Sequence, residues 1–153
     1  NIFKENKTPF IINQPSYSML NRWIEEDGLY DYAIKSKIGL AVFSPLHQGM
    51  LTDRYLNGIP KDSRIGKGNP WLKEEQITES LLNKLNLLNE IAKDRGQKLS
   101  QLALSWVLRD GVVTTVLCGA SRKSQIIDNV EAVYNTKFTQ EELSKIEEIL
   151  KVE

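Results

Sequence analysis

Three polar loop segments carry the residues that could bind a ligand. Each follows a short apolar run of the sequence: Asn13 and Gln14 the first, Ser44 and Pro45 the second, and residues 119–121 the third. In parallel α/β proteins the carboxyl ends of the strands meet on one face, and that face carries the site. The spacing therefore predicts one binding surface built from all three loops.

The third loop has residue types suited to an anion. Ser121 lies where a helix is expected to begin, so its N–H and those that follow would be unpaired donors at the positive end of the helix dipole. Arg122 and Lys123 from this helix, and Arg54 and Arg64 from an earlier loop, could reach the same anion. Gln125 and Asn129, one helical turn apart, lie on one face and could reach an adenine or ribose edge. Taken singly, each is better explained as a solvated cation or a helix cap. Taken together, they predict a site for one phosphorylated ligand.

The catalytic sets of common hydrolases and metalloenzymes are absent from the sequence. The chain has one histidine, His47, and one cysteine, Cys118, and it has no G-x-S-x-G, P-loop or G-x-G-x-x-G pattern. We interpret His47 as a surface or ligand-edge residue, and Cys118, which stands among apolar neighbours, as a core cysteine. The acid for carbonyl chemistry would be a tyrosine or lysine beside an aspartate, and no such pairing can be assigned.

The elements that must position these loops alternate between strands and helices. Short apolar and β-branched runs predict strands at residues 9–15, 39–43 and 112–118. Apolar residues at helical spacing predict helices at residues 28–36, 74–95, 101–109, 119–134 and from 139 onward. This alternation predicts an α/β protein with a parallel sheet and right-handed crossovers.

The expected helix ends and buried faces depend on a few residues. Gly96 would follow the second helix as its C′ residue, Ser100 would cap the third, and Thr139 would open a capping box with Glu142. The apolar faces expected to be buried are Ile126, Ile127, Val130 and Val133 on the fourth helix, and Leu143, Ile146, Ile149 and Leu150 on the last.

One long connection interrupts this pattern. Residues 55–72 are rich in glycine and proline, with basic residues between them. Irregular connections of this length are uncommon in compact domains and are often functional, so we predict a lid-like loop, with a plain surface loop as the alternative.

Length and composition indicate one ordinary domain. The chain has 153 residues, of which 41% are hydrophobic and 26% charged, and 20 basic residues balance 20 acidic ones. This balance gives no field that would attract nucleic acid or an anionic membrane. A single cysteine fits a reducing compartment, and no apolar run approaches the length of a membrane span, so we expect a cytoplasmic protein.

The predicted sheet is too small to be complete. Three parallel strands would leave two open edges beside buried strands, which favours a partner, self-association or a missing half of the protein to cover them. The chain also begins at Asn1 without an initiator methionine, which suggests a piece of a longer protein.

Three motifs, at residues 11–22, 43–55 and 117–129, resemble the carboxy-terminal half of an aldo-keto reductase. The branch they resemble most contains bacterial glyceraldehyde-3-phosphate reductases and potassium-channel β-subunits. The resemblance implies that the three strands are the sixth to eighth of a (β/α)₈ barrel that binds NADP(H). The chain would then be a single partial domain, incomplete as a closed barrel.

The resemblance also implies roles for individual residues. Gln14 would hold the nicotinamide carboxamide, and Phe43 would stack on the nicotinamide ring. The pyrophosphate would be lined by Ser44, Pro45, Leu46, His47 and Gln48. Arg54 would take the place of the family's phosphate-binding lysine, and Arg64 resembles a second cofactor-binding arginine. The adenosine and its 2′-phosphate would be held by Gly119, Ser121, Arg122, Gln125, Asp128 and Asn129. The chain departs from the family's pattern at Asp53, usually a glycine, and at His47, usually a small residue.

The family's catalytic aspartate, tyrosine, lysine and histidine lie in the amino-terminal half. The resemblance thus implies an oxidoreductase that reduces small carbonyl compounds with NADPH, of which this chain carries most of the cofactor site and no catalytic residue. Two alternatives are a non-catalytic NADP-binding or regulatory module and an inactive, self-associating barrel fragment.

Overall fold

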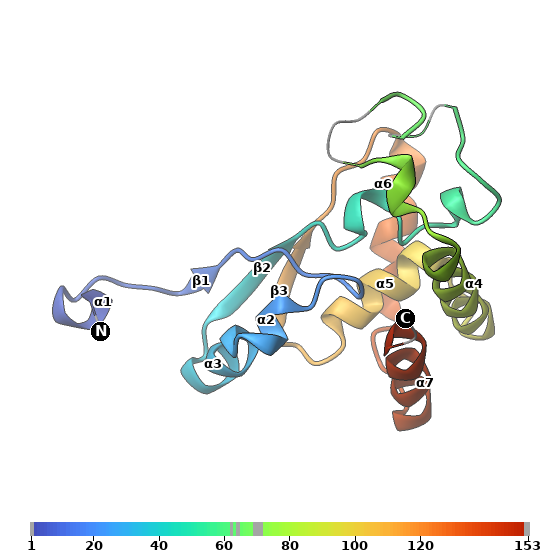
Figure 1. Cartoon of the computed structure of the whole chain (residues 1–153). Coiled ribbons are helices and arrows are strands. Elements are labelled where there is room, and N and C mark those ends of the chain that lie inside the picture. The colour runs from blue at the N-terminus through green and yellow to red at the C-terminus, as the bar shows by residue number, and fades with distance from the viewer. Residues whose placement is uncertain (1, 62, 64, 69–71, 152–153) are drawn as a thin grey trace.

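The computed structural model of the chain describes residues 2–61, 63, 65–68 and 72–151. Its strands β1 (Ile12–Asn13), β2 (Gly39–Phe43) and β3 (Val113–Leu117) are parallel and lie in the order β1-β2-β3 (Figure 1). Within the described residues the sheet is open, with β2 in the middle. The predicted α/β architecture with a parallel sheet is confirmed.

The strand ends explain how the binding loops come together. Phe43 of β2 pairs in register with Leu117 of β3, so the loops after the two strands begin side by side. β1 is shorter than the predicted strand, because prolines flank its apolar residues and cannot donate to a ladder. The chain after β1 still follows β2: the N–H of Phe43 donates to the carbonyl of Pro15 at 3.0 Å, and the N–H of Tyr17 donates to the carbonyl of Phe43 at 3.2 Å.

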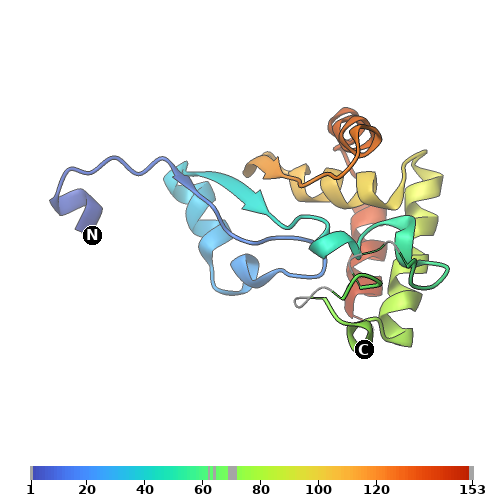
Figure 2. The same cartoon turned by 90° about the horizontal axis from the view of Figure 1, so that it is seen from above.

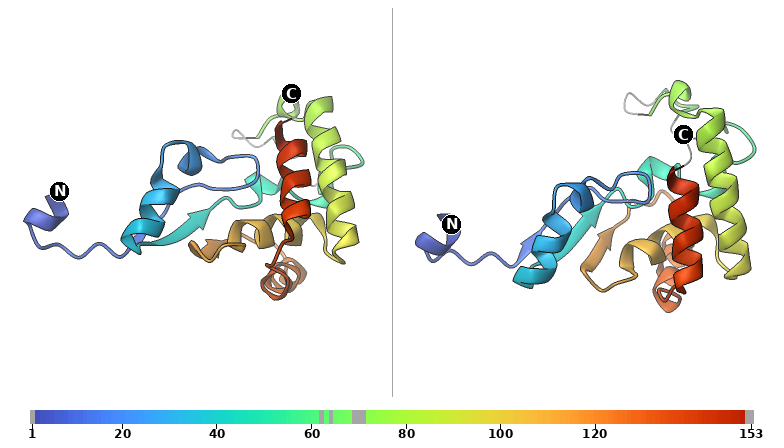
Figure 3. Two further views of the ribbon diagram at one scale, coloured as in Figure 1. Left: turned by 90° about the horizontal axis from the view of Figure 1, so that it is seen from below. Right: turned by 60° about the horizontal axis from the view of Figure 1, so that its bottom comes forward.

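The helices cover the sheet and extend beyond its carboxyl ends. They are α1 (Ile2–Glu5), α2 (Trp23–Glu26), α3 (Leu29–Ser36), α4 (Glu79–Asp94), α5 (Leu99–Leu108), α6 (Lys123–Val130) and α7 (Gln140–Lys151), and short 3₁₀ turns lie at His47–Gly49, Asp53–Tyr55, Glu74–Gln76 and Glu131–Tyr134. α4 and α7 lie side by side in every view, and α1 stands apart at the end of an extended segment (Figures 2 and 3).

The main core lies between β2 and the helices. Leu40 and Val42 of β2 pack with Leu102 and Trp106 of α5, and the core continues to Ile146 of α7. All five side chains are fully buried. Because α5 contributes to the core along nearly its whole length, it anchors both the sheet and the α4–α7 pair.

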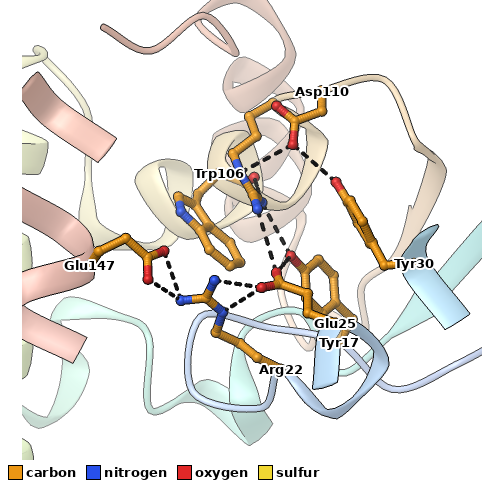
Figure 4. A network of polar contacts seen from close by, with 8 residues as sticks. Tyr17, Arg22, Glu25, Tyr30, Trp106, Asp110 and Glu147 are labelled. Atoms are coloured by element: carbon orange, nitrogen blue, oxygen red, sulfur yellow. Dashed lines mark hydrogen bonds and ion pairs between the residues drawn. The ribbon is translucent and has the colours of Figure 1, made fainter. Parts of the chain in front are cut away.

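A network of polar side chains ties α2 to α5 and α7 (Figure 4). Arg22 Nη1 donates to both carboxylate oxygens of Glu147, at 2.7 Å each, and Arg22 Nε donates to Glu25 Oε2 at 3.0 Å. Glu25 also accepts the hydroxyl of Tyr17, which itself accepts from Arg109 Nη1 at 3.2 Å. The network therefore fixes Tyr17, and with it the segment that follows β1.

The indole of Trp106 lies at the centre of this network. The guanidinium of Arg109 lies 3.8 Å from the ring centroid and that of Arg22 lies 5.2 Å away. In the described part of the chain, the buried Trp106 Nε1 has no hydrogen-bond partner. The ring is held by packing and by the two cations.

Several predicted helix ends are confirmed and others are wrong. Gly96 follows α4 with φ +66°, and Thr139 and Glu142 form the predicted capping box, with each side chain accepting the other's N–H. The predicted helix 74–95 is interrupted, because Thr78 caps α4 through its hydroxyl, which accepts the N–H of Leu81 at 3.1 Å. Ser100 is not a cap, since α5 already begins at Leu99 and Ser100 is buried within it.

The expected burial of the α6 face is wrong. Ile126, Ile127, Val130 and Val133 are all at least half exposed. Three of them, Ile126, Val130 and Val133, border an apolar groove of about 350 Å³ together with residues of β3. No other element of the described residues covers this face. The inward face of α7 is as predicted: Ile146 is fully buried, with Leu143, Ile149 and Leu150 packed around it, and all four belong to the main core.

The long connection packs partly against the body. Tyr55 and Leu72, near its two ends, are buried and form a small second cluster with Met50. Residues 62, 64 and 69–71 lie outside the described part of the chain. Whether the connection acts as a lid stays a prediction.

Among the described residues, no helix has the length and hydrophobicity needed to cross a bilayer.

Candidate functional site

A cleft of about 970 Å³ opens at the carboxyl ends of β2 and β3. One wall is the loop after β2, the other is the loop after β3 with α6, and the start of α5 closes one side. Most of the predicted site residues line it: Phe43, Ser44, Pro45, Leu46, Gln48, Arg54, Gly119, Ser121, Arg122, Gln125, Asp128 and Asn129. The parallel topology thus brings together residues up to 86 positions apart, such as Phe43 and Asn129.

The remaining predicted site residues are not in the lining. Gln14 is exposed after β1, and Arg64 lies outside the described residues. The ring of His47 turns into the protein, where its Nδ1 lies 3.5 Å from the Oγ of the fully buried Ser18. Burial lowers the pKa of the His47 imidazole. His47 is only partly buried, so its interpretation as a surface or ligand-edge residue stays a prediction.

The loop after β2 has an unusual backbone. Ser44, His47 and Gln48 have φ values of +55°, +45° and +57°, in the left-handed region that non-glycine residues rarely adopt. Gly49 follows with φ +98°. Such conformations cost on the order of 1–3 kcal/mol each and persist only where the surroundings enforce them, typically at functional sites.

Short hydrogen bonds hold this loop in its shape. The N–H of Gly49 donates to the carbonyl of Leu46 at 2.9 Å, and the N–H of Met50 donates to the carbonyl of His47 at 3.1 Å. The hydroxyl of Thr52 donates to the carbonyl of Gly49 at 2.6 Å. Pro45 is buried beneath the loop. These hydrogen bonds give the loop a fixed shape, and most of its residues line the cleft.

The start of α6 differs from the prediction of unpaired donors. The Oε1 of Gln125 accepts the N–H of Ser121 at 2.9 Å and the N–H of Arg122 at 3.2 Å. The side chain of Gln125 therefore occupies the place where an anion was expected. A ligand that used these N–H groups would have to displace it.

The cleft has an excess of positive charge. Its described lining contains four cationic side chains and two carboxylates: Arg54, Lys67, Lys98 and Arg122, with Asp53 and Asp128. Lys98 Nζ and Asp128 Oδ2 form an ion pair at 2.8 Å, and this contact raises the pKa of the Lys98 ammonium. A surface of this kind attracts a ligand with several negative charges.

Part of the cleft lining is apolar. The ring of Phe43 and the side chain of Leu117 are each 44% exposed at the ends of their strands. An exposed aromatic face beside an aliphatic group is suited to stacking against a flat ring. Cys118, next to Leu117, was predicted to lie in the core, but it is exposed. Partial burial of its thiol raises the thiol's pKa.

Some lining residues were not found from the sequence. Thr52, Lys98 and Ser100 contribute to the cleft, and none had been singled out as a binding residue. Thr52 could have been recognised from the sequence as a cap, because it precedes the short turn Asp53–Tyr55. Its hydroxyl accepts the N–H of Arg54 at 3.4 Å. Lys98 and Ser100 have no local signal of this kind, because only the packing of α5 against α6 brings them to the site. The described residues contain no group of three or more metal-ligating side chains.

Comparison with known proteins places this arrangement in context. A model of the Aldo/keto reductase family matches residues 1–151. L-glyceraldehyde 3-phosphate reductase of Escherichia coli (strain K12) is 48% identical over 150 residues, covering 96% of this chain and 43% of that protein. A putative voltage-gated potassium channel subunit beta of Schizosaccharomyces pombe is 37% identical over 151 residues, covering 96% of this chain and 44% of that protein.

Solved structures agree. The glycerol dehydrogenase AKR11B4 from Gluconobacter oxydans superposes with a TM-score of 0.72 at 28% identity, covering 91% of this chain and 42% of that one. The holo form of aldo-keto reductase AKR11C1 from Bacillus halodurans gives 0.65 at 28% identity, covering 97% and 46%. The chain thus spans less than half the length of these relatives. The predicted family branch and the predicted fold, part of a (β/α)₈ barrel with an unclosed sheet, are confirmed.

Proposed function

Because this chain belongs to the aldo/keto reductase family, we propose that its cleft binds NADP(H). One observation supports this most: a single cleft joins an exposed aromatic ring to an excess of cations. A nicotinamide dinucleotide carries a flat ring and several phosphates on one molecule, so it matches both features. The family match supports a nicotinamide cofactor, and the cations favour the form with the additional phosphate.

The proposed roles follow the positions in the cleft. Phe43 stacks on the nicotinamide ring, and the preformed loop of Ser44, Pro45, Leu46, His47 and Gln48 presents its backbone to the pyrophosphate, with Arg54 beside it. His47 contributes its backbone only, since its ring faces Ser18. The adenosine part lies along Gly119, Ser121, Arg122, Gln125, Asp128 and Asn129. Gln14 and Arg64 remain proposed contacts to the nicotinamide carboxamide and to a phosphate.

The proposed reaction is that of a carbonyl reductase. In the whole protein, a hydride passes from NADPH to the carbonyl carbon of a small aldehyde or ketone, and a proton passes to its oxygen, giving an alcohol and NADP⁺. This chain would hold the cofactor and orient its nicotinamide. The proton donor would come from the amino-terminal part of such a protein, so the 153-residue chain alone is proposed to bind without turnover. A single cysteine supports a cytoplasmic location.

A fluorescence titration of the chain with NADPH tests the proposal. Stacking on an aromatic ring contributes about 0.5–1.5 kcal/mol, so Phe43→Ala should raise the Kd by roughly threefold to tenfold. Phe10→Ala is the matched control, since Phe10 is similarly exposed and lies outside the cleft. Absence of binding by the unmodified chain at about 1 mM NADPH would contradict the proposal, because the affinity would be too weak for a cofactor site.

Similarity to a putative channel β-subunit supports a second candidate, a regulatory module that binds NADP(H) without chemistry. Both candidates predict no turnover by the 153-residue chain alone, so a turnover assay on the whole protein separates them. If the role were regulatory, the whole protein would not oxidise NADPH with a carbonyl substrate. Oxidation above background with glyceraldehyde or methylglyoxal by the 153-residue chain alone would contradict the proposal that it lacks the proton donor.

The open side of β3 supports a further proposal about assembly. The groove between β3 and the exposed face of α6 is lined by Thr114, Val116, Ile126, Val130 and other mainly apolar residues. We propose that a strand and helix from the rest of the protein, or from a second copy of the chain, cover it.

A further inference from the structure

Lys98 occupies a distinctive position in the cleft. It precedes α5, and it reaches the lining from a segment that contributes to neither of the two main walls. Its ammonium forms the 2.8 Å ion pair with Asp128 of α6, and the charge of Asp53, from the opposite wall, also acts on it. The ammonium is thus paired with a carboxylate of α6, and Asp53 of the opposite wall also lines the cleft.

The contact between α5 and α6 at this point does not depend on Lys98 alone. Gln101 Nε2 donates to the backbone carbonyl of Asp128 at 2.9 Å, one turn along α5 from Lys98. The buried Ser105 donates to the carbonyl of Ala132 at 2.9 Å and strengthens the same packing. The fold therefore has other means of holding α6 in place, which leaves the ammonium available for a ligand.

The ion pair itself is easily exchanged. The side chains of Lys98 and Asp128 are 51% and 37% exposed, and ion pairs at this exposure contribute little to stability. A phosphate monoester carries close to two negative charges and three acceptor oxygens, so it competes well with one carboxylate for an ammonium. Without Lys98, the same phosphate would meet the carboxylate of Asp128 with its ion-pair partner removed.

We propose that Lys98 is a specificity residue. Its ammonium exchanges its ion pair with Asp128 for a contact to a phosphate monoester on the ligand's ribose, and this exchange makes the cleft prefer the phosphorylated dinucleotide. This rests on the proposed function, since it assumes that the adenosine end of the ligand lies along α6. Arg122 approaches from the start of α6 and Lys98 from its last turn, six residues or about 9 Å further along the helix. The two cations therefore reach the cleft at different points along α6.

The test compares two probes by calorimetry on the full 153-residue chain at fixed ionic strength: adenosine 2′,5′-bisphosphate and adenosine 5′-monophosphate. Lys98→Met should weaken the bisphosphate about tenfold and the monophosphate less than twofold. Lys98→Arg, which keeps the charge, should restore most of the preference. Lys145→Met is the matched control, since it removes a lysine from an ion pair of 2.9 Å on α7, far from the cleft lining.

The outcomes separate this proposal from the one it rests on. If the unmodified chain binds both probes and Lys98→Met weakens them equally, or not at all, Lys98 has no part in specificity and the proposal is overturned while NADP(H) binding stands. If the unmodified chain binds neither the probes nor NADPH, the proposed function fails and this proposal fails with it. The circular dichroism spectrum of Lys98→Met should match that of the unmodified chain. If this variant unfolds, the test uses Lys98→Arg, whose preference for the bisphosphate should be close to that of the unmodified chain.

Discussion

The loop after β2 shows how individual residues prepare the site. Ser44, His47 and Gln48 all have positive φ, and the hydrogen bonds around Gly49 close the loop on itself. A loop that already has its binding shape loses little freedom when a ligand arrives, which favours affinity. We therefore see the strain as the cost of a preformed wall for the pyrophosphate.

Gly49→Ala should destabilise the chain by about 1–2 kcal/mol, because φ +98° is unfavourable for any residue with a Cβ. Urea unfolding measures the change. Gly119→Ala is the control for stability, since Gly119 has no positive φ and an added Cβ there would meet no atom within 4 Å. Equal stabilities for the two variants would show that the fold does not require a positive φ at residue 49.

The site could be predicted from the sequence as far as backbone topology determines it. The residues that end β2 and begin α6 had to meet, because parallel strands place their carboxyl ends together. The directions of side chains could not be predicted. His47 turns to Ser18, Gln125 caps its own helix, and Lys98 arrives through the packing of α5, and each depends on contacts between segments distant in sequence.

At the scale of elements, the sequence patterns worked where burial follows periodicity. β2 and α7 match their predictions because each has one face against the main core. The fourth helix failed for the opposite reason. Its apolar stripe was taken as a core face, yet Ile126, Ile127 and Val130 are exposed, since a stripe indicates that something covers it and not that this chain does.

Arg22→Met should lower the free energy of unfolding by about 1–3 kcal/mol, because it removes the hydrogen bonds that Arg22 donates to Glu25 and Glu147 and leaves the Glu147 carboxylate without that donor. Lys145→Met breaks an exposed ion pair and should change the stability much less than Arg22→Met. Chemical denaturation of both variants gives the comparison. Equal losses would mean that the network in Figure 4 contributes no more than a surface pair.

Stability should fall as the pH falls below about 4.5, the ordinary pKa of a glutamate. Burial acts to raise the pKa of Glu25, but hydrogen bonds from Arg22 and Tyr17 and the charges of Arg22 and Arg109 outweigh it, so the pKa is lowered. The contribution of a group with a lowered pKa is complete above its unfolded value and is lost as the pH falls through the folded value.

Unfolding free energies between pH 7 and pH 3 measure this effect. Glu25→Gln should make the dependence less steep, because the variant has no carboxylate to protonate at that position. Glu142 should contribute in the same direction, since hydrogen bonds from the Thr139 backbone and Arg95 outweigh burial and lower its pKa as well. An unchanged slope in Glu25→Gln would exclude the network as a source of acid sensitivity.

At the scale of the whole molecule, the open sheet favours self-association of the chain. The groove beside β3 and the exposed α6 face should drive association, so size-exclusion chromatography with light scattering should give a mass above the 17.5 kDa of one chain. Ile127→Glu should reduce that mass, because it places a charge on the apolar face. Lys123→Glu, on the same helix, is a control for charge. A stable monomer with slowly exchanging β3 amides would contradict the proposal.

The central claim is that one cleft at the ends of β2 and β3 holds the dinucleotide. Amide chemical shifts of the ¹⁵N-labelled chain, recorded during titration with NADPH, test it most directly. The largest changes should fall in residues 43–54 and 117–129 and leave α7 unaffected. Changes confined to α7 or to the outer face of α6, or none at saturating NADPH, would contradict the account.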